Sequence, residues 1–165
     1  MLIFAGLLTC LMVTVIIADV TRYIIPNWLV GTVLLLYPFF VYFSPARPDW
    51  KIALLVALGV FVAGFCLFAL RLMGGGDIKL LMATSLWIGY EHLFEFIFWI
   101  AISGGILSVL LLLVRFAIDK AIANRAEKPV LPRVLIRGAP APYGVAIAIA
   151  FMAFMWMDKM PGMVL

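Results

Sequence analysis

The sequence predicts an all-α, polytopic integral membrane protein with about six transmembrane helices. Of its 165 residues, 67% are hydrophobic and 12% are charged, whereas soluble domains are about half apolar and about a quarter charged. A soluble domain of this length still exposes much of its surface and could not hide so much apolar area. Each span needs roughly 20 apolar residues, so the spans would occupy nearly the whole chain. We therefore expect residues 1–165 to form a single membrane-embedded domain.

Apolar runs define the first three predicted spans. The first covers residues 2–18 and lacks the basic start of a secretory signal, so we expect it to be retained. The dipeptide Pro26-Asn27 then marks a turn, because proline cannot continue a helix and asparagine favours turns. The second run, residues 28–43, contains Pro38 and is expected to kink there. The third run covers residues 52–70.

The second half of the chain gives three more predicted spans. The fourth run, residues 80–90, is too short to cross a bilayer unless its helix begins near Asp77. The fifth run, residues 93–114, contains Glu95 near one end, where we expect the side chain to reach the membrane surface. The sixth begins around residues 140–143 and reaches Met157. Its start follows the one long polar stretch of the chain.

The distribution of Lys and Arg predicts the orientation, because cytoplasmic loops carry an excess of both. Nine of the 12 basic residues fall on one side of the predicted spans and three on the other. The first group comprises Arg22, Arg71, Lys79, Arg115, Lys120, Arg125, Lys128, Arg133 and Arg137. The second comprises Arg47, Lys51 and Lys159. This asymmetry predicts that residues 115–139 form a basic cytoplasmic loop and that both termini lie outside.

The basic loop 115–139 is expected to interact with lipid rather than with nucleic acid. Its six basic residues and two acidic residues, Asp119 and Glu127, give a net charge of +4. A nucleic-acid patch is the alternative, but the pattern of basic residues interleaved with aromatic residues is missing. We interpret the charge as a positive-inside signal that also attracts anionic headgroups. The partner expected here is the lipid bilayer.

No metal site is expected from the cysteines. Cys10 and Cys66 both lie inside apolar runs, far apart in sequence, and neither belongs to a C-x-x-C pair. Buried cysteine usually acts as a small hydrophobic side chain. Carboxylates are therefore the better candidates for chemistry, because a carboxylate in hydrocarbon is costly unless it is protonated, paired or facing water.

The most unusual stretch of the chain is the glycine run that precedes Asp77. Each of Gly74, Gly75 and Gly76 would cost about 1 kcal/mol relative to alanine inside a helix. Glycine allows close approach of another chain and a left-handed backbone, and irregular backbone at membrane depth is tolerated where it lines a wet cavity. The pattern predicts a water-accessible reaction centre at Asp77. An ordinary turn with a surface aspartate is the alternative. A phosphate-binding loop is not expected, because the G-x-x-x-x-G-K-[ST] pattern is missing.

Asp19 is the expected partner of Asp77, because the orientation places both at the same membrane face. Aspartyl proteolysis needs one ionised carboxyl to take a proton from water and one protonated carboxyl to polarise the amide carbonyl. Two carboxyls held close together cannot both ionise, so they share a proton. Arg22 follows Asp19 on the same helix face. We expect Arg22 to point to headgroups, since a tight ion pair would oppose the shared proton.

The sequence resembles the type IV prepilin peptidases, a family that includes the archaeal preflagellin peptidases. Three segments carry the resemblance: Gly74-x-Gly76-Asp77, the stretch from Asp19 to Ile25-Pro26-Asn27, and Pro142-Tyr143-Gly144. They are similar to the family's G-x-G-D motif, its first catalytic aspartate with the following Ile-Pro-Asn, and the Pro-Tyr-Gly of its last core helix. Three motifs in the family's order form a much more specific signal than G-x-G-D alone.

The resemblance implies a membrane aspartyl endopeptidase in which Asp19 and Asp77 form the catalytic dyad, without metal or cofactor. The implied partner is a pilin or pseudopilin precursor, whose basic leader is cut after a glycine at the cytoplasmic face of the bacterial inner membrane. Gly74, Gly75 and Gly76 would give the substrate backbone room to approach. No nucleic acid is implied, and the sequence carries no signal for an oligomeric state.

Other features place this chain among the short members of the family, such as those serving Flp or tight-adherence pili. It lacks the large cytoplasmic insert with Cys-x-x-Cys pairs, so N-methyltransferase activity is not expected. Pro142 and Tyr143 are expected to pack at the start of the sixth helix near the site. Lys79, two residues beyond Asp77, is grouped with the residues that could bind substrate or shape the site. Anchoring to headgroups is its favoured role, and a catalytic role is the alternative.

Two other functions fit some of these features. A small proton- or ion-coupled transporter would also carry membrane aspartates and broken helices. The short chain, the lack of an apparent inverted repeat and the placement of both aspartates at one face weigh against it. A non-catalytic subunit of a secretion system is the third candidate.

Overall fold

The computed structural model describes residues 2–122, 131–136 and 138–163. The described residues form six α-helices and one short 3-10 helix, without any strand. In chain order these are α1 (Leu2–Arg22), α2 (Asn27–Phe43), α3 (Trp50–Ala69), α4 (Gly75–Ile88), α5 (Leu93–Ile122), η1 (Arg133–Leu135) and α6 (Tyr143–Trp156). The prediction of an all-α chain is confirmed.

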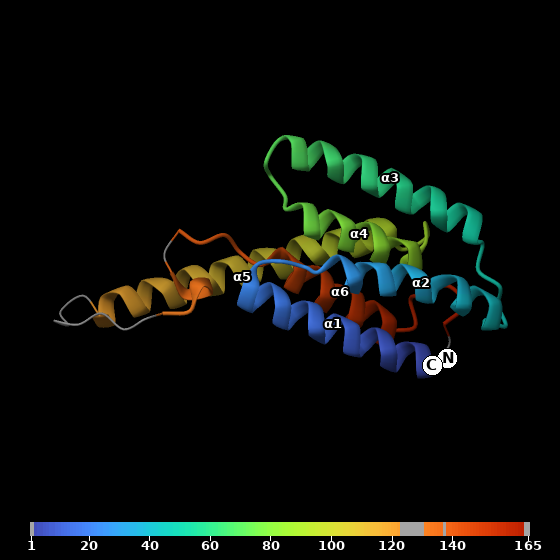
Figure 1. Ribbon diagram of the computed structural model, residues 1–165, viewed down its shortest axis with the longest axis horizontal. Coiled ribbons are helices and arrows are strands. Elements are labelled where there is room, and N and C mark those ends of the chain that lie inside the picture. The colour runs from blue at the N-terminus through green and yellow to red at the C-terminus, as the bar shows by residue number, and fades with distance from the viewer. Residues whose placement is uncertain (1, 123–130, 137, 164–165) are drawn as a thin grey trace.

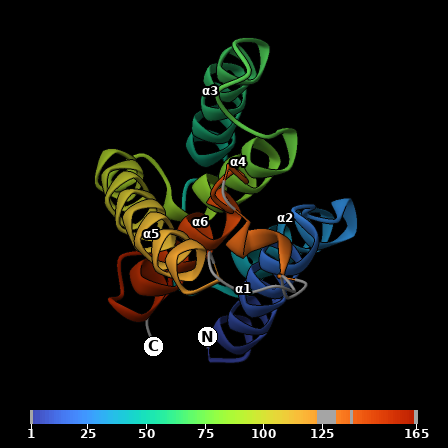
Figure 2. The ribbon, with the colours of Figure 1, turned by 90° about the vertical axis from the view of Figure 1, so that its left-hand side faces the viewer.

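The two short helices α4 and α6 form the centre of the bundle (Figures 1 and 2). Helix α6 packs against α1, α5 and α4, and α4 packs in turn against α2 and α3. Helix α3 lies on the outside and has α4 as its main packing partner. Every other helix is thus placed by its contact with α4 or α6, and both of these begin at the same end of the bundle.

Aromatic side chains fix α2 onto α4. The indole Nε1 of Trp87 donates a hydrogen bond to the carbonyl oxygen of Val33 at 3.1 Å. Its ring packs against those of Tyr37 and Phe40, with centroids 5.3 and 5.0 Å away. A buried indole N–H needs such a partner, because an unpaired donor in an apolar interior is costly. This contact holds the middle and second half of α2 against the end of α4.

Three helices, α1, α3 and α5, are long and apolar enough to cross a membrane, and α2 and α6 are shorter apolar helices. Large apolar side chains cover the outside of the bundle; Phe94, for example, is 84% exposed. Such a surface is stable in lipid and would aggregate in water. The count of six spans and the orientation remain predictions.

The fourth helix begins where the length argument requires. Helix α4 starts at Gly75, so that Asp77 lies in its first turn. Pro38, where we expected a kink, lies inside α2, and the helix continues past it to Phe43. The predicted boundaries of the other spans agree with the helices to within a few residues, except at the end of α5.

Helix α5 continues to Ile122, eight residues beyond the predicted end at residue 114. The reason is Arg115, which is only 6% exposed and is satisfied inside the protein. Its guanidinium donates hydrogen bonds to three backbone carbonyls, those of Val134, Ala139 and Pro140. Part of the predicted loop 115–139 is therefore helix, and its last part folds back onto α5. The basic residues Arg125, Lys128 and Arg137 lie outside the described residues.

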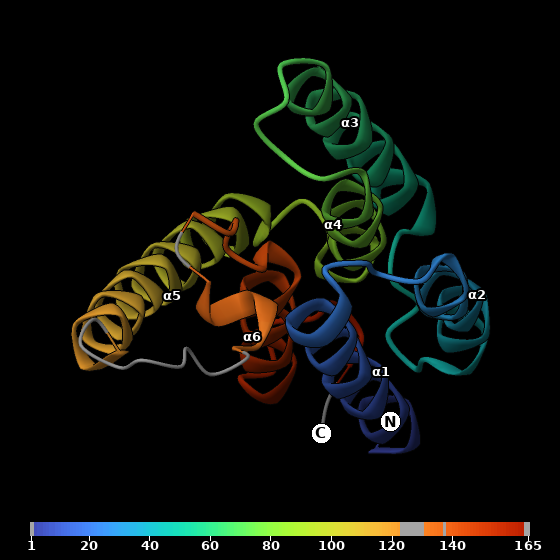
Figure 3. The same cartoon turned by 60° about the vertical axis from the view of Figure 1, so that its left-hand side comes forward.

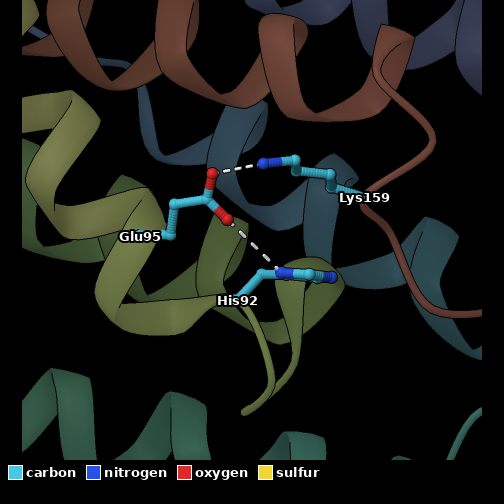
Figure 4. A network of polar contacts seen from close by, with 3 residues as sticks. All are labelled: His92, Glu95 and Lys159. Carbon is cyan, nitrogen blue, oxygen red and sulfur yellow. Dashed lines mark hydrogen bonds and ion pairs between the residues drawn. The ribbon is translucent and has the colours of Figure 1, made fainter.

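At the opposite end of the bundle, Glu95 has partners of its own (Figure 4). It forms an ion pair with Lys159, from the segment after α6, and its Oε2 atom lies 3.5 Å from Nδ1 of His92. The expectation that Glu95 simply reaches the surface was incomplete, since it also ties α5 to the C-terminal segment. The hydroxyl of Ser44 makes a similar tie by donating to the carbonyl oxygen of Gly162 at 2.9 Å.

Candidate active site

A cavity of about 1070 Å³ opens at the end of the bundle where α4 and α6 begin. The ends of α1 and α3 and the segment before α6 complete its wall. Seven residues that the sequence analysis singled out line it: Asp19, Gly74, Gly75, Gly76, Asp77, Lys79 and Tyr143. Pro142 is buried just behind the wall, as the residue that precedes α6. The structure thus brings the predicted site residues together from three parts of the chain.

Asp19 caps a helix that lies far from it in sequence. Its side chain is 4% exposed, and its Oδ2 atom accepts a hydrogen bond from the backbone N–H of Val145 at 3.2 Å. The first backbone N–H groups of a helix have no partner inside the helix. Pro142, at the N-cap of α6, offers no side-chain acceptor for them. The carboxylate of Asp19 takes this role and lies at the positive end of the α6 dipole.

Gly144 makes this contact possible. A methyl group on its Cα would lie 2.7 Å from Oδ2 of Asp19 and 2.7 Å from Cδ1 of Ile25. Both distances are far shorter than van der Waals contact, so a larger residue would displace the carboxyl. The sequence analysis named Gly144 as part of the Pro-Tyr-Gly segment but expected only Pro142 and Tyr143 to pack near the site. The signal available was a glycine placed directly at the start of a helix.

Asp77 is the third residue of α4, after Gly75 and Gly76. Its carboxylate turns back toward the start of its own helix, where Oδ2 lies 2.8 Å from the place that a Gly74 Cβ would occupy. The carboxylate of Asp77 also lies near the backbone amide of Gly144. The same amide lies near the carboxylate of Asp19. The two carboxyls are close enough for the charge on one to act on the other. One helix N-terminus therefore faces both acids.

The three glycines before Asp77 are needed for space rather than for a left-handed backbone. None of them has a positive φ, so the left-handed backbone that glycine allows is not used in this run. A Cβ on Gly76 would lie 3.3 Å from Cβ of Ile25, which is tighter than ordinary contact. A Cβ on Gly75 would meet only the ring of Phe68 at 3.5 Å. The crowding falls on the first and third glycines of the run.

Lys79 is bound at the rim of the cavity. Its Nζ atom donates a hydrogen bond to Oδ1 of Asn27 at 3.1 Å. This contact links the second turn of α4 to the first residue of α2. Its side chain stays exposed, and the role of Lys79 at the headgroups or at the site stays a prediction. Asn27 belongs to the Ile-Pro-Asn segment, and its role at the site was not foreseen.

Two further residues near the cavity are notable. Arg22 is exposed, and no ion pair joins it to Asp19 in the described part of the chain. Tyr23 follows with a φ of 54°, which is strained for a residue other than glycine. Its ring lies 5.5 Å from the guanidinium of Arg133, and its buried hydroxyl has no hydrogen-bond partner among the described residues. Tyr23 was not predicted, because a tyrosine after a helix has no distinctive pattern.

Comparison with known protein families matches residues 6–109 to the type IV leader peptidase family. This match covers more than half of the chain and includes both Asp19 and Asp77. Searches of curated proteins and of solved structures found no match. The apolar helices and the family agree that the protein is integral to a membrane. The chain belongs to the type IV leader peptidase family and is a protease of the prepilin-peptidase kind.

Proposed function

We propose that the protein is an aspartyl endopeptidase that removes the leader of pilin-like precursors at the cytoplasmic face of the bacterial inner membrane, with Asp19 and Asp77 as its catalytic dyad. The main support is that α1 and α4 each bring one carboxyl to the same cavity and to the same helix N-terminus. Family membership supports the reaction class. The proposal needs neither metal nor cofactor and includes no methyl transfer.

In the proposed mechanism the two carboxyls share one proton. The ionised carboxyl takes a proton from a water molecule, whose oxygen attacks the carbonyl carbon of the scissile amide. The protonated carboxyl donates its proton to the carbonyl oxygen, and a neutral tetrahedral diol results. In the second step the carboxyl that is now ionised takes a proton back from the diol. The other carboxyl donates its proton to the amide nitrogen, and the C–N bond breaks. The dyad ends with one proton, as it began.

The positions of the acids suit this chemistry. Two carboxyls in a partly dry site cannot both ionise at close range, which maintains the shared proton. The amides of Gly144 and Val145 hold Asp19 in one orientation, so its position does not depend on solvent. The cavity gives water and an extended peptide access to both acids. Gly74, Gly75 and Gly76 line the cavity, so a peptide in it would lie beside the first turn of α4.

The proposal is tested by cleavage of a Flp-type prepilin in detergent or liposomes. Asp19→Asn and Asp77→Asn should each abolish the size shift, whereas Glu91→Gln, at an exposed carboxylate elsewhere, should leave it intact. Wild-type-like cleavage by either Asn variant would remove that residue from the mechanism. An uncleaved precursor together with ion flux through the wild-type protein would favour the transporter instead.

A further inference from the structure

A second, apolar cavity of about 550 Å³ lies between α2 and α3, toward the end opposite the candidate site. Its walls are Leu34, Pro38 and Val41 of α2 and Trp50 and Leu54 of α3. Its floor includes Leu86 of α4, the helix that separates α2 from α3. Figures 2 and 3 show α3 standing apart from α2, with α4 set back between them.

The apolar cavity and the candidate active site lie toward opposite ends of the same three helices. The active-site cavity touches the other ends of the same three helices, at Asn27 of α2, Phe68 of α3 and Lys79 of α4. On α2, a single face at helical spacing joins the two cavities: Asn27, Gly31, Leu34, Pro38 and Val41. From Asn27 to Val41 this face is about 21 Å long at 1.5 Å per residue.

Gly31 lies on that face about one helical turn from Asn27 and has empty space beside it. A Cβ there would meet no atom within 4 Å. On α3, the facing stripe is aromatic and apolar: Trp50, Leu54, Phe61, Phe65 and Phe68 recur at helical spacing. We call the space between these two faces, above α4, the α2–α3 groove.

We propose that the α2–α3 groove docks the hydrophobic helix of the membrane-anchored substrate, with its end placed at Asp19 and Asp77. This inference rests on the proposed function. A precursor cut at the membrane face has its apolar helix directly beside the scissile bond. That helix must leave the active-site cavity along an apolar path, and the groove begins where the cavity touches α2, α3 and α4.

The features of the groove suit a helix as its occupant. In lipid, helices associate through close packing rather than through a hydrophobic driving force, and small residues let their backbones approach. Gly31 supplies that approach on α2, while Phe65 and Phe68 on α3, with ring centroids 6.3 Å apart, supply a broad packing surface. Lipid tails and a second copy of this chain are the other occupants, and the test separates them.

The first test is site-specific photo-crosslinking in membranes to a Flp-type prepilin, in the Asp77→Asn background so that the precursor is not consumed. A photoreactive residue at Leu54, in the groove, is compared with one at Leu55, the neighbouring leucine that points elsewhere on α3. The two are 55% and 68% exposed, so both are open to partners. Leu34 and Leu35 form the same pair on α2. Crosslinks to the precursor at Leu34 and Leu54, and not at Leu35 and Leu55, are the expected result.

Three crosslinking patterns between proteins would overturn the proposal. They are equal crosslinking at all four positions, crosslinking only at the control positions, and crosslinks that join two copies of the protein whether or not precursor is present. Adducts with lipid alone would assign the groove to lipid and contradict the proposal as well. Cleavage by the wild-type protein is measured in parallel. Failure of cleavage would count against the proposed function, while normal cleavage without groove crosslinks would count against the groove alone.

The second test fills the groove. Gly31→Leu should raise KM for the precursor about tenfold, equivalent to about 1.4 kcal/mol of binding, with little change in kcat. The matched control is Gly105→Leu on α5, where a Cβ also meets nothing within 4 Å. Thermal stability in detergent is measured for both variants, so that a loss of folding is separated from a change in KM. The control should keep the wild-type KM. An unchanged KM in Gly31→Leu would contradict docking in the groove.

Discussion

The Oδ2 atom of Asp19 accepts a hydrogen bond from the backbone N–H of Val145 at 3.2 Å, which links the last turn of α1 to the first turn of α6. The two residues are far apart in sequence, yet the bond satisfies a free helix donor and fixes a buried carboxyl at the same time. Gly144, one residue earlier, brings its amide toward both Asp19 and Asp77. Helix α6 is therefore part of the candidate site through its backbone.

Gly144→Ala tests this relationship. The added methyl would lie 2.7 Å from Oδ2 of Asp19, so the carboxyl must move. A misplacement of about 1 Å can reduce turnover by about 100-fold, and we expect a loss of this order in prepilin cleavage. Gly105→Ala, in open space on α5, is the control and should cleave normally. Full activity in a folded Gly144→Ala protein would show that the position of Asp19 does not depend on α6.

The glycine run makes a graded prediction. Gly76→Ala should reduce cleavage strongly, because its methyl would press on Ile25 at 3.3 Å beside the site. Gly75→Ala should be mild, since its methyl meets Phe68 at an ordinary 3.5 Å and alanine favours the helix by about 1 kcal/mol. Precursor cleavage and thermal stability in detergent are measured for both. If both variants cleave the precursor as fast as the wild type does, the glycine run forms only an ordinary turn.

Arg115 is expected to be a structural residue. Replacing it with Met removes the donor for the carbonyls of Val134, Ala139 and Pro140. A hydrogen bond to a charged group contributes about 1.5–3 kcal/mol, so Tm in detergent should fall clearly. Pro140 lines the active-site cavity, and cleavage should weaken as well. Lys120→Met, at an exposed position near the end of the same helix, is the control. A Tm equal to that of the control would contradict this role.

The predicted orientation has its own test. In a background without Cys10 and Cys66, a cysteine replaces Lys120 or Arg47, both of which are exposed. An impermeant thiol reagent added to intact cells should label the Arg47→Cys protein and spare the Lys120→Cys protein, since the charge asymmetry places them on opposite sides. The reverse pattern would invert the topology and move the candidate site to the outer face.

Much of the fold could be predicted, because the apolar runs are interrupted by charged residues and prolines. The end of α5 could not be predicted. From the sequence alone, Arg115 looks like the first residue of a polar loop, because its three carbonyl partners are known only from the structure. Asp19 and Asp77 stood out as carboxylates beside apolar runs on one predicted face. The contact of Lys79 with Asn27 could not be foreseen, because Asn27 lies on another helix.

The contribution of α6 was harder to foresee. Its donors are backbone N–H groups, which are the same in every sequence and leave no residue pattern. Gly144 is the one sign of this contact in the sequence. A glycine at the start of a helix becomes informative only when the atom that faces it is known. The α2–α3 groove was missed for a related reason. Helix spacing reveals a face but does not tell which neighbour, if any, covers it.

The most direct test of the dyad is the single-turnover rate of prepilin cleavage by Asp19→Asn, Asp77→Asn and the double variant. Residues that act as one unit are strongly non-additive: removing either one costs about as much as removing both. We predict that all three variants are folded and share the same residual rate, with Glu91→Gln as the active control. A double variant slower than either single variant by the product of their separate effects would contradict a shared-proton dyad, and so would measurable wild-type-like cleavage by either single variant.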